Sequence, residues 1–126
     1  MNTERILVVE DDLFLRELYA DILQGEGYNV ETAIDGEEAL AKIKVGGYDL
    51  ILLDIIMPKI DGLEVMRRVK KEPPQSPNKS VLFLTNLDKD EEIKAALQLG
   101  DGYLIKSQIN PGSLVEEVKN YLNKPK

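Results

Sequence analysis

The sequence predicts an α/β fold in which five parallel strands form one sheet, in the common order 2-1-3-4-5, with five helices on both faces. Short apolar runs alternate strictly along the chain with longer segments of helical periodicity. Three runs contain no polar residue, which is typical of strands covered on both faces of a parallel sheet. The length of 126 residues suits one domain, so we expect a single domain over residues 1–126.

The predicted strands are the apolar runs themselves. They cover residues 6–9, 29–33, 50–53, 81–84 and 103–105. The second run alternates polar and apolar residues, so we expect it at an edge of the sheet. Five β-α units of this kind pack most economically as one doubly wound sheet.

The predicted helices carry apolar residues at spacings of three and four. They cover residues 13–23, 36–45, 63–69, 91–99 and 114–122. Asp12 can cap the start of the first helix, and Gly25 and Gly27 can end it. Gly100 is expected to stop the fourth helix, and Pro111 stands near the start of the fifth.

Composition excludes several classes of function. The formal net charge is −7, whereas a nucleic-acid binder needs a basic face, so we expect no direct nucleic-acid partner. The basic residues within 67–71 are interpreted as the solvated side of a helix. The chain has no cysteine and no histidine, so its chemistry must rely on carboxylates, hydroxyls and lysines.

The beginning of the chain carries no targeting signal that we can identify. The first apolar run, at residues 6–9, is too short for a signal peptide or a membrane span. We therefore expect a cytoplasmic protein that does not contact a membrane.

Reactive side chains follow the predicted strands at the places where the strands end. Glu10 and Asp11 come after the first strand, Asp54 after the third, Thr85 after the fourth and Lys106 after the fifth. Ligand sites in parallel sheets lie at these carboxyl ends, and the first and third strands are neighbours in the expected order. Three crowded carboxylates repel one another unless a cation neutralises them, and an all-oxygen set favours Mg²⁺ before Ca²⁺.

This set suits phosphoryl transfer. A carboxylate such as Asp54 can attack phosphorus and form an aspartyl phosphate. The metal ion, the Lys106 ammonium and the Thr85 hydroxyl could then each bind one phosphoryl oxygen. Each residue alone has a structural explanation, as a loop acid, a strand end or a surface lysine, but the joint pattern is hard to explain by chance.

Four segments together resemble the receiver domains of bacterial two-component response regulators, which have a flavodoxin-like fold. The most specific segment, residues 54–62, reads Asp-Ile-Ile-Met-Pro-Lys-Ile-Asp-Gly. The others are Ile-Leu-Val-Val-Glu-Asp-Asp at 6–12, Leu-Thr-Asn at 84–86 and Gly-Tyr-Leu-Ile-Lys at 102–106. The resemblance spans nearly the whole chain.

The resemblance implies that Asp54 accepts a phosphoryl group from a sensor histidine kinase or a phosphotransfer protein. Glu10 and Asp11 would form the acidic pair that binds Mg²⁺ together with Asp54, and the backbone carbonyl of Ile56 would be a further ligand. Such a domain is a phosphorelay switch rather than an ordinary enzyme, because it catalyses only its own phosphorylation and hydrolysis.

The resemblance also implies how the signal leaves the site. Lys106 would contact the phosphoryl group, Thr85 would move toward it, and Tyr103 would turn inward as the coupled aromatic residue. The fourth helix, fifth strand and fifth helix would then contact a downstream output protein or effector domain. The chain would act alone through protein contacts or as part of a longer regulator.

The sequence departs from the family pattern in four places. Ser107 stands where a cis proline is usual, so another bend must follow Lys106, and Asn86 stands where alanine or glycine is usual. Residues 99–103 are one residue shorter than the usual link into the fifth strand. Ile56 and Leu87 are apolar where polar residues could position water, which predicts a long-lived phosphorylated state.

Three other functions share parts of this pattern. A phosphatase acting through an aspartyl phosphate usually has a second acid two residues after its nucleophile, where this chain has Ile56. A flavodoxin-type cofactor site needs a phosphate loop rich in Ser, Thr and Gly after the first strand, where this chain has acids. A pseudo-receiver that binds partners without phosphorylation would require Ser107 or the short link to have disrupted the site.

Overall fold

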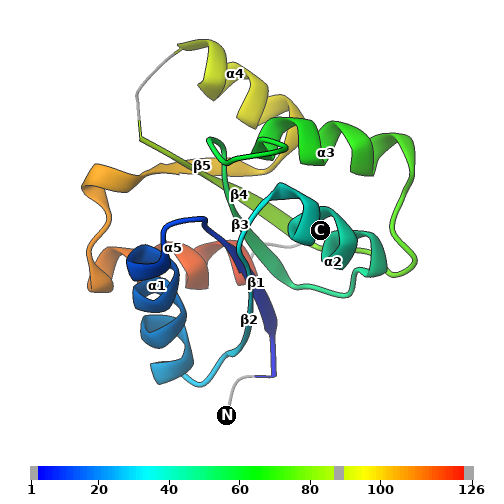
Figure 1. The fold of residues 1–126 in the computed structure, drawn as a ribbon. Helices are drawn as coiled ribbons and strands as arrows, with labels where there is room; N and C mark the ends of the chain where they lie inside the picture. The colour runs from blue at the N-terminus through cyan, green and yellow to red at the C-terminus, as the bar shows by residue number, and fades with distance from the viewer. Residues whose placement is uncertain (1–2, 87–89, 124–126) are drawn as a thin grey trace.

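The computed structural model describes residues 3–86 and 90–123, in which strands and helices alternate along the chain (Figure 1). The elements are β1 (Arg5–Val9), α1 (Leu13–Gly25), β2 (Asn29–Ala33), α2 (Gly36–Val45), β3 (Leu50–Asp54), α3 (Gly62–Lys71), β4 (Ser80–Thr85), α4 (Asp90–Leu99), β5 (Gly102–Ile105), the 3₁₀ helix η1 (Lys106–Gln108) and α5 (Pro111–Leu122).

One parallel sheet organises the fold. Its strand order is β2-β1-β3-β4-β5, and every neighbouring pair is parallel. Helices α1 and α5 cover one face of the sheet, and α2, α3 and α4 cover the other (Figure 1). The predicted fold class and strand order are therefore confirmed, and the alternating second run does lie at an edge.

Alternate side chains of the central strands enter two separate cores. On β1, Leu7 and Val9 pack toward α2, α3 and α4, whereas Ile6 and Val8 pack toward α1 and α5. The same alternation repeats along β3 and β4, whose residues are all buried. Because both faces are covered, an apolar residue is favoured at each position of these strands.

Several helices begin or end beyond the predicted residues, because polar caps decide the boundaries. Helix α5 begins at Pro111, three residues before the predicted start, since Asn110 accepts a hydrogen bond from the Ser113 amide and completes a capping box. Helix α1 includes Gly25, and the chain turns afterwards at Gly27, whose φ is 89°. Gly100 ends α4 as predicted.

The short link into β5 is held against β4 by one aspartate. The Asp101 amide donates to the Val81 carbonyl at 2.8 Å, and the Asp101 carboxylate accepts from the Val81 amide at 2.7 Å. A Cβ atom on Gly102 would lie 2.1 Å from the Tyr121 hydroxyl, so glycine lets α5 approach the start of β5. The shortened segment therefore still delivers β5 in parallel register beside β4.

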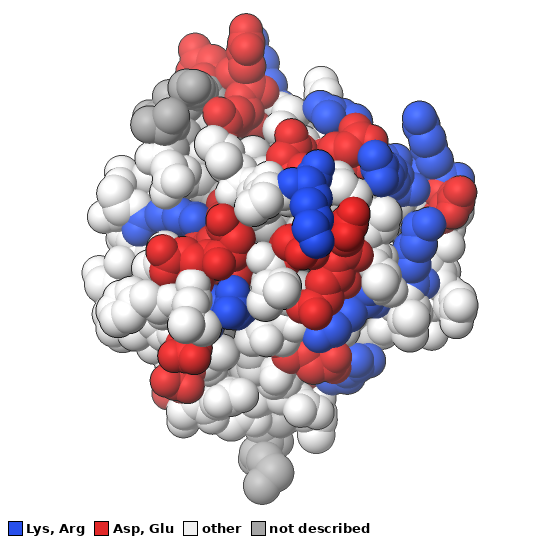
Figure 2. Space-filling model, viewed as in Figure 1, with Lys and Arg blue, Asp and Glu red and all other residues white. Residues whose placement is uncertain are grey.

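No helix in the described part of the chain has the length and apolar character needed to cross a membrane. Acidic and basic side chains lie interspersed on the face shown in Figure 2.

The connection from β3 to α3 returns closely onto the end of β3. The Gly62 amide donates to the Ile55 carbonyl at 2.8 Å, and the Asp61 carboxylate caps α3 by accepting from the Glu64 amide at 2.8 Å. A Cβ atom on Gly62 would lie 2.3 Å from the Asp54 carbonyl oxygen. Only glycine permits this approach without moving the backbone of Asp54.

We predict that Gly62→Ala lowers the free energy of unfolding by about 1–3 kcal/mol, because the backbone must shift to admit the methyl group. Urea denaturation measures this loss. Gly25→Ala is the matched control, since a Cβ atom there meets nothing within 4 Å. Equal stability of the two variants would contradict the close approach.

Candidate functional site

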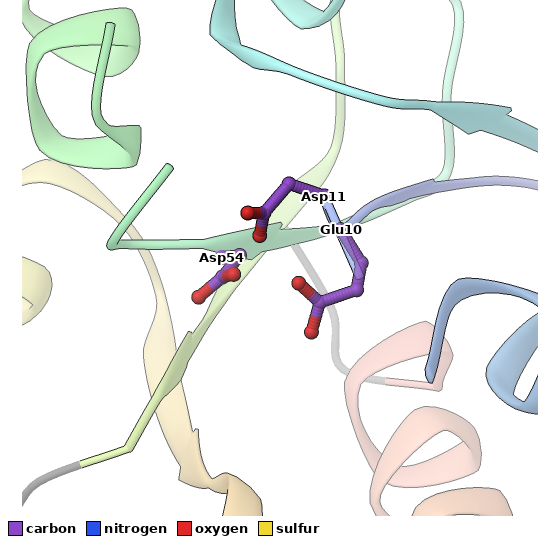
Figure 3. Close-up of side chains that lie close together, drawn as sticks. All are labelled: Glu10, Asp11 and Asp54. Atoms are coloured by element: carbon purple, nitrogen blue, oxygen red, sulfur yellow. The ribbon is translucent and has the colours of Figure 1, made fainter. Parts of the chain in front are cut away.

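The parallel register brings three carboxylates together at the carboxyl end of the sheet (Figure 3). Val9 of β1 pairs with Leu53 of β3, and the next residues are Glu10, which follows β1, and Asp54, which ends β3. Ligand oxygens of Glu10, Asp11 and Asp54 all lie within 4.8 Å of one another. Glu10 and Asp54 are buried, whereas Asp11 is exposed. The predicted convergence of these acids is thus present in the structure.

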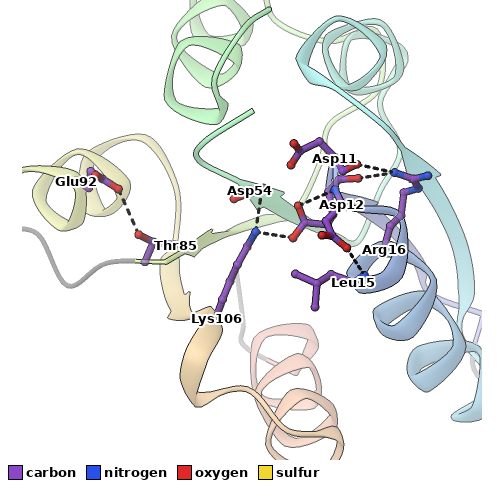
Figure 4. Close-up of polar contacts among 9 residues, drawn as sticks. Asp11, Asp12, Leu15, Arg16, Asp54, Thr85, Glu92 and Lys106 are labelled. Carbon is purple, nitrogen blue, oxygen red and sulfur yellow. Dashed lines mark hydrogen bonds and ion pairs between the residues drawn. The ribbon is translucent and has the colours of Figure 1, made fainter. Parts of the chain in front are cut away.

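Lys106 enters the same cluster from the end of β5 (Figure 4). Its Nζ lies 2.5 Å from Glu10 Oε1 and 2.9 Å from Asp54 Oδ2, and only 9% of its side chain is exposed. The expected bend after Lys106 is supplied by η1, in which the Ile109 amide donates to the Lys106 carbonyl. Ser107 lies within this 3₁₀ turn and does not prevent Lys106 from reaching the acids.

The site holds more negative than positive charge. Burial raises the pKa of Asp54 to about 8; Glu10 adds to the rise, and Lys106 opposes it only in part. Burial also disfavours ionisation of Glu10, but its contacts with Asp54 and Lys106 outweigh that effect and lower its pKa. Burial and the neighbouring Glu10 raise the pKa of Asp11. One ammonium is therefore insufficient to keep all three carboxylates ionised.

The donor set fits a hard divalent cation such as Mg²⁺. The buried Asp54 Oδ1 accepts no hydrogen bond from the described residues, which leaves a buried polar oxygen that a cation could bind. The other available ligands are carboxylate oxygens, which suit Mg²⁺, and nearby Asp11 is exposed, which suits an ion that keeps several waters. A second positive charge here would favour ionised Asp54.

Arg16 braces the loop that carries the two acids after β1, a role that the sequence analysis did not assign. Its Nη1 donates to the Glu10 carbonyl at 2.9 Å and to the Asp11 carbonyl at 3.4 Å (Figure 4). Asp12 caps α1 by accepting from the Leu15 amide at 2.9 Å, as predicted. The sequence does place Arg16 in the first turn of the helix that Asp12 caps, from which its side chain can reach back to the preceding loop.

The other residues predicted for the site make different contacts. The Thr85 hydroxyl donates to Glu92 Oε1 on α4 at 3.2 Å and is directed toward that helix (Figure 4). Tyr103 is partly buried and packs against the core beneath α2, α3 and α4. The side chain of Ile56, two residues after Asp54, is 55% exposed.

Two departures from the family pattern concern the segment after β4. Asn86 is exposed beside the end of this strand. Leu87 lies outside the described residues.

The raised pKa of Asp54 predicts a pH-dependent stability when no divalent cation is present. The folded state binds this proton up to about pH 8, whereas an unfolded aspartate releases it near pH 4. The free energy of unfolding should therefore fall as the pH rises from about 4 through 8. Asp54→Asn should remove this decline and be more stable than the wild type by about 1 kcal/mol or more at pH 8.

Urea denaturation in EDTA at several pH values measures both effects, and Mg²⁺ should flatten the wild-type profile. Asp21→Asn, on the exposed side of α1, serves as the control. Parallel pH profiles for the wild type and Asp54→Asn would refute the prediction.

Comparison with known proteins places this arrangement in one family. A family model for the response regulator receiver domain matches residues 6–119. The chain is 34% identical over 121 residues to the chemotaxis protein CheY of Treponema pallidum (strain Nichols). That match covers 94% of this chain and 82% of the relative.

Longer regulators match over only part of their length. The chain is 35% identical over 120 residues to a CpxR homolog, a transcriptional regulatory protein of Haemophilus influenzae. That match covers 95% of this chain and 51% of the relative. The chain likewise spans 49% of the transcriptional regulatory protein PhoP of Bacillus subtilis, so it covers about half the length of these relatives.

Solved structures agree with the sequence matches. A receiver domain protein from Methanospirillum hungatei JF-1 superposes with a TM-score of 0.85 at 33% identity, over 97% of this chain and 95% of that chain. The response regulator TrrA of Thermotoga maritima, in complex with Mg²⁺-BeF, gives a TM-score of 0.79 at 40% identity. That match covers 94% of this chain and 98% of the TrrA chain. By sequence and fold together, this chain belongs to the CheY-like receiver domains of two-component response regulators, which act in signal transduction.

Proposed function

We propose that this chain is a phosphorylatable switch in which Asp54 accepts a phosphoryl group with the help of Mg²⁺. The observation that carries the proposal is that the two oxygens of the Asp54 carboxylate have different surroundings. Lys106 holds Oδ2 at 2.9 Å, while Oδ1 is buried without a hydrogen-bond donor among the described residues. Family membership and the acids beside it support the same function.

The chemistry follows from this asymmetry. Asp54 Oδ1 forms a bond to phosphorus, the bond between phosphorus and the donor's leaving atom breaks, and the electron pair departs with the leaving group. Mg²⁺, held by Glu10, Asp11, Asp54 and the Ile56 carbonyl, would neutralise charge on the phosphoryl oxygens. Lys106 already lies beside Asp54, so its ammonium needs only a short movement to contact a second phosphoryl oxygen.

The remaining residues would report the phosphorylated state. Thr85 would bind the third phosphoryl oxygen, and Tyr103 would turn inward as the hydroxyl moves. Thr85 pairs with Ile105 of β5, and Tyr103 lies on the same strand. We place the contact with an output protein or effector domain on the surface formed by α4, β5 and α5. The phosphoryl donor would be a histidine kinase or a phosphotransfer protein, and residues 1–126 would act as one receiver domain with no other substrate.

Acetyl phosphate tests this function without a kinase. The purified protein with Mg²⁺ and acetyl phosphate should gain the mass of one phosphoryl group, and the gain should vanish with EDTA and in Asp54→Asn. Intact-mass spectrometry measures the gain, and Asp21→Asn should behave as the wild type. A wild-type protein that gains no mass would instead indicate a pseudo-receiver.

The apolar side chain of Ile56, two residues after Asp54, predicts slow hydrolysis of the aspartyl phosphate. The Ile56 side chain is exposed. An apolar side chain has no group that could orient an attacking water. We expect a half-life of minutes or longer, shortened about three- to tenfold in Ile56→Asn, the range of one modest hydrogen bond. Loss of the phosphoryl mass after removal of acetyl phosphate measures this rate.

The matched control for hydrolysis is Val45→Asn, which adds the same amide at a similarly exposed β-branched residue at the end of α2. Its rate should equal that of the wild type. A wild-type half-life of seconds would refute the slow-hydrolysis prediction, and so would equal rates for Ile56→Asn and the wild type.

A further inference from the structure

The hydroxyl of Thr85 is committed to a partner outside the acidic cluster. Thr85 ends β4 and is only 2% exposed, so its hydroxyl needs a protein acceptor. It donates to Glu92 Oε1 at 3.2 Å, and Figure 4 shows the two side chains facing each other across the space between β4 and α4. Glu92 is itself partly buried.

A single hydroxyl proton can serve one strong acceptor at a time. The proposed role of Thr85 requires it to donate to a phosphoryl oxygen on Asp54, whereas in the structure the hydroxyl is directed toward Glu92 (Figure 4). The two hydrogen bonds therefore exclude each other. Any free energy that stabilises the contact with Glu92 opposes the phosphorylated arrangement.

The charge of α4 does not by itself explain this contact. Asp90, Glu91 and Glu92 all lie in the first turn of α4, where acidic residues stabilise the helix through its dipole (Figure 2 shows acidic side chains at this end). Glu91 is exposed, whereas Glu92 faces β4 and accepts from Thr85. Glu92 thus has a specific partner that its neighbour lacks among the described contacts.

We propose that Glu92 is a positioning residue that holds the Thr85 hydroxyl toward α4 and away from Asp54, and so restrains the switch in its unphosphorylated state. This inference rests on the proposed phosphorylation of Asp54. When the hydroxyl turns to the phosphoryl group, Glu92 loses its bond to β4, and the start of α4 is released from the end of that strand. The hydrogen bond between Thr85 and Glu92 therefore opposes phosphorylation and also connects the end of β4 to the start of α4.

Beryllofluoride with Mg²⁺, a stable analogue of the phosphoryl group, is a suitable probe. Isothermal titration calorimetry of the whole chain gives its apparent dissociation constant. Glu92→Ala should bind the probe about three- to tenfold more tightly than the wild type, the range of one ordinary net hydrogen bond, because Glu92 is only partly buried. Glu92→Gln, which keeps a neutral acceptor, should give a smaller gain.

Two controls separate the hydrogen bond from charge and from folding. Glu91→Ala removes the same charge from the same helical turn and should change the affinity by less than about twofold, as expected for an exposed charge. In a Thr85→Ala background, which has no hydroxyl to restrain, Glu92→Ala should have no further effect on affinity. Urea denaturation confirms that each variant is folded.

The outcomes are distinguishable. Tighter binding in Glu92→Ala alone, lost when Thr85 is also replaced, supports the restraint. Equal affinities for Glu92→Ala and Glu91→Ala overturn it, and so does a gain that persists without the Thr85 hydroxyl. If Glu92→Ala does not fold, the comparison of Glu92→Gln with Glu91→Gln decides in the same way. A wild-type protein that binds no beryllofluoride and accepts no phosphoryl group refutes the proposed function, and the restraint fails with it.

Discussion

The central constraint in this protein is the close approach of three carboxylates, two of which share the ammonium of Lys106. Glu10 and Asp54 are almost completely buried, and Lys106 contacts both. Such a cluster costs desolvation energy, and it survives only because the surrounding sheet fixes its members in place. The proposed chemistry would draw on this cost, since a cation bound beside Asp54 would relieve the repulsion among the acids and favour the ionised, nucleophilic carboxylate.

The sheet meets this constraint by being rigid on both sides. Its central strands are covered on each face, so the ends of β1, β3 and β4 hold their positions relative to one another. The loops beyond those ends are then tied back individually. Gly62 returns the β3–α3 connection onto Asp54, and Arg16 holds the carbonyls of Glu10 and Asp11. Rigid strands with anchored loops keep the reacting groups in register.

One contact on the opposite side of the site behaves differently. The bond between Thr85 and Glu92 joins a strand end to the first turn of a helix, and it does not contribute to the acidic cluster. Thr85 is buried, whereas Glu92 is only partly buried. Because the bond joins two polar side chains, rotation of these side chains can exchange it without breaking the apolar contacts of the core. The acids and Thr85 thus all lie at rigid strand ends, and in the proposed switch only the direction of the Thr85 hydroxyl would change.

The sequence alone determined the fold, because each apolar run has the length and composition of a strand covered on both faces. It also determined which residues end the strands, and with them the convergence of Glu10, Asp11, Asp54 and Lys106, since parallel strands share one carboxyl edge. Helix boundaries were less accurate: the start of α5 depends on the side chain of Asn110, which apolar periodicity does not report.

Only the tertiary structure decided how the unusual segments fit and which side chains meet across the fold. The bend at Ser107 and the short link at Asp101 depend on backbone hydrogen bonds to specific neighbours. The contacts of Arg16 and of Glu92 depend on the direction in which a helix presents one residue. Spacing along the chain states which residues share a strand end, but a side-chain contact between separate elements depends on their packing and on the rotamers that this packing permits.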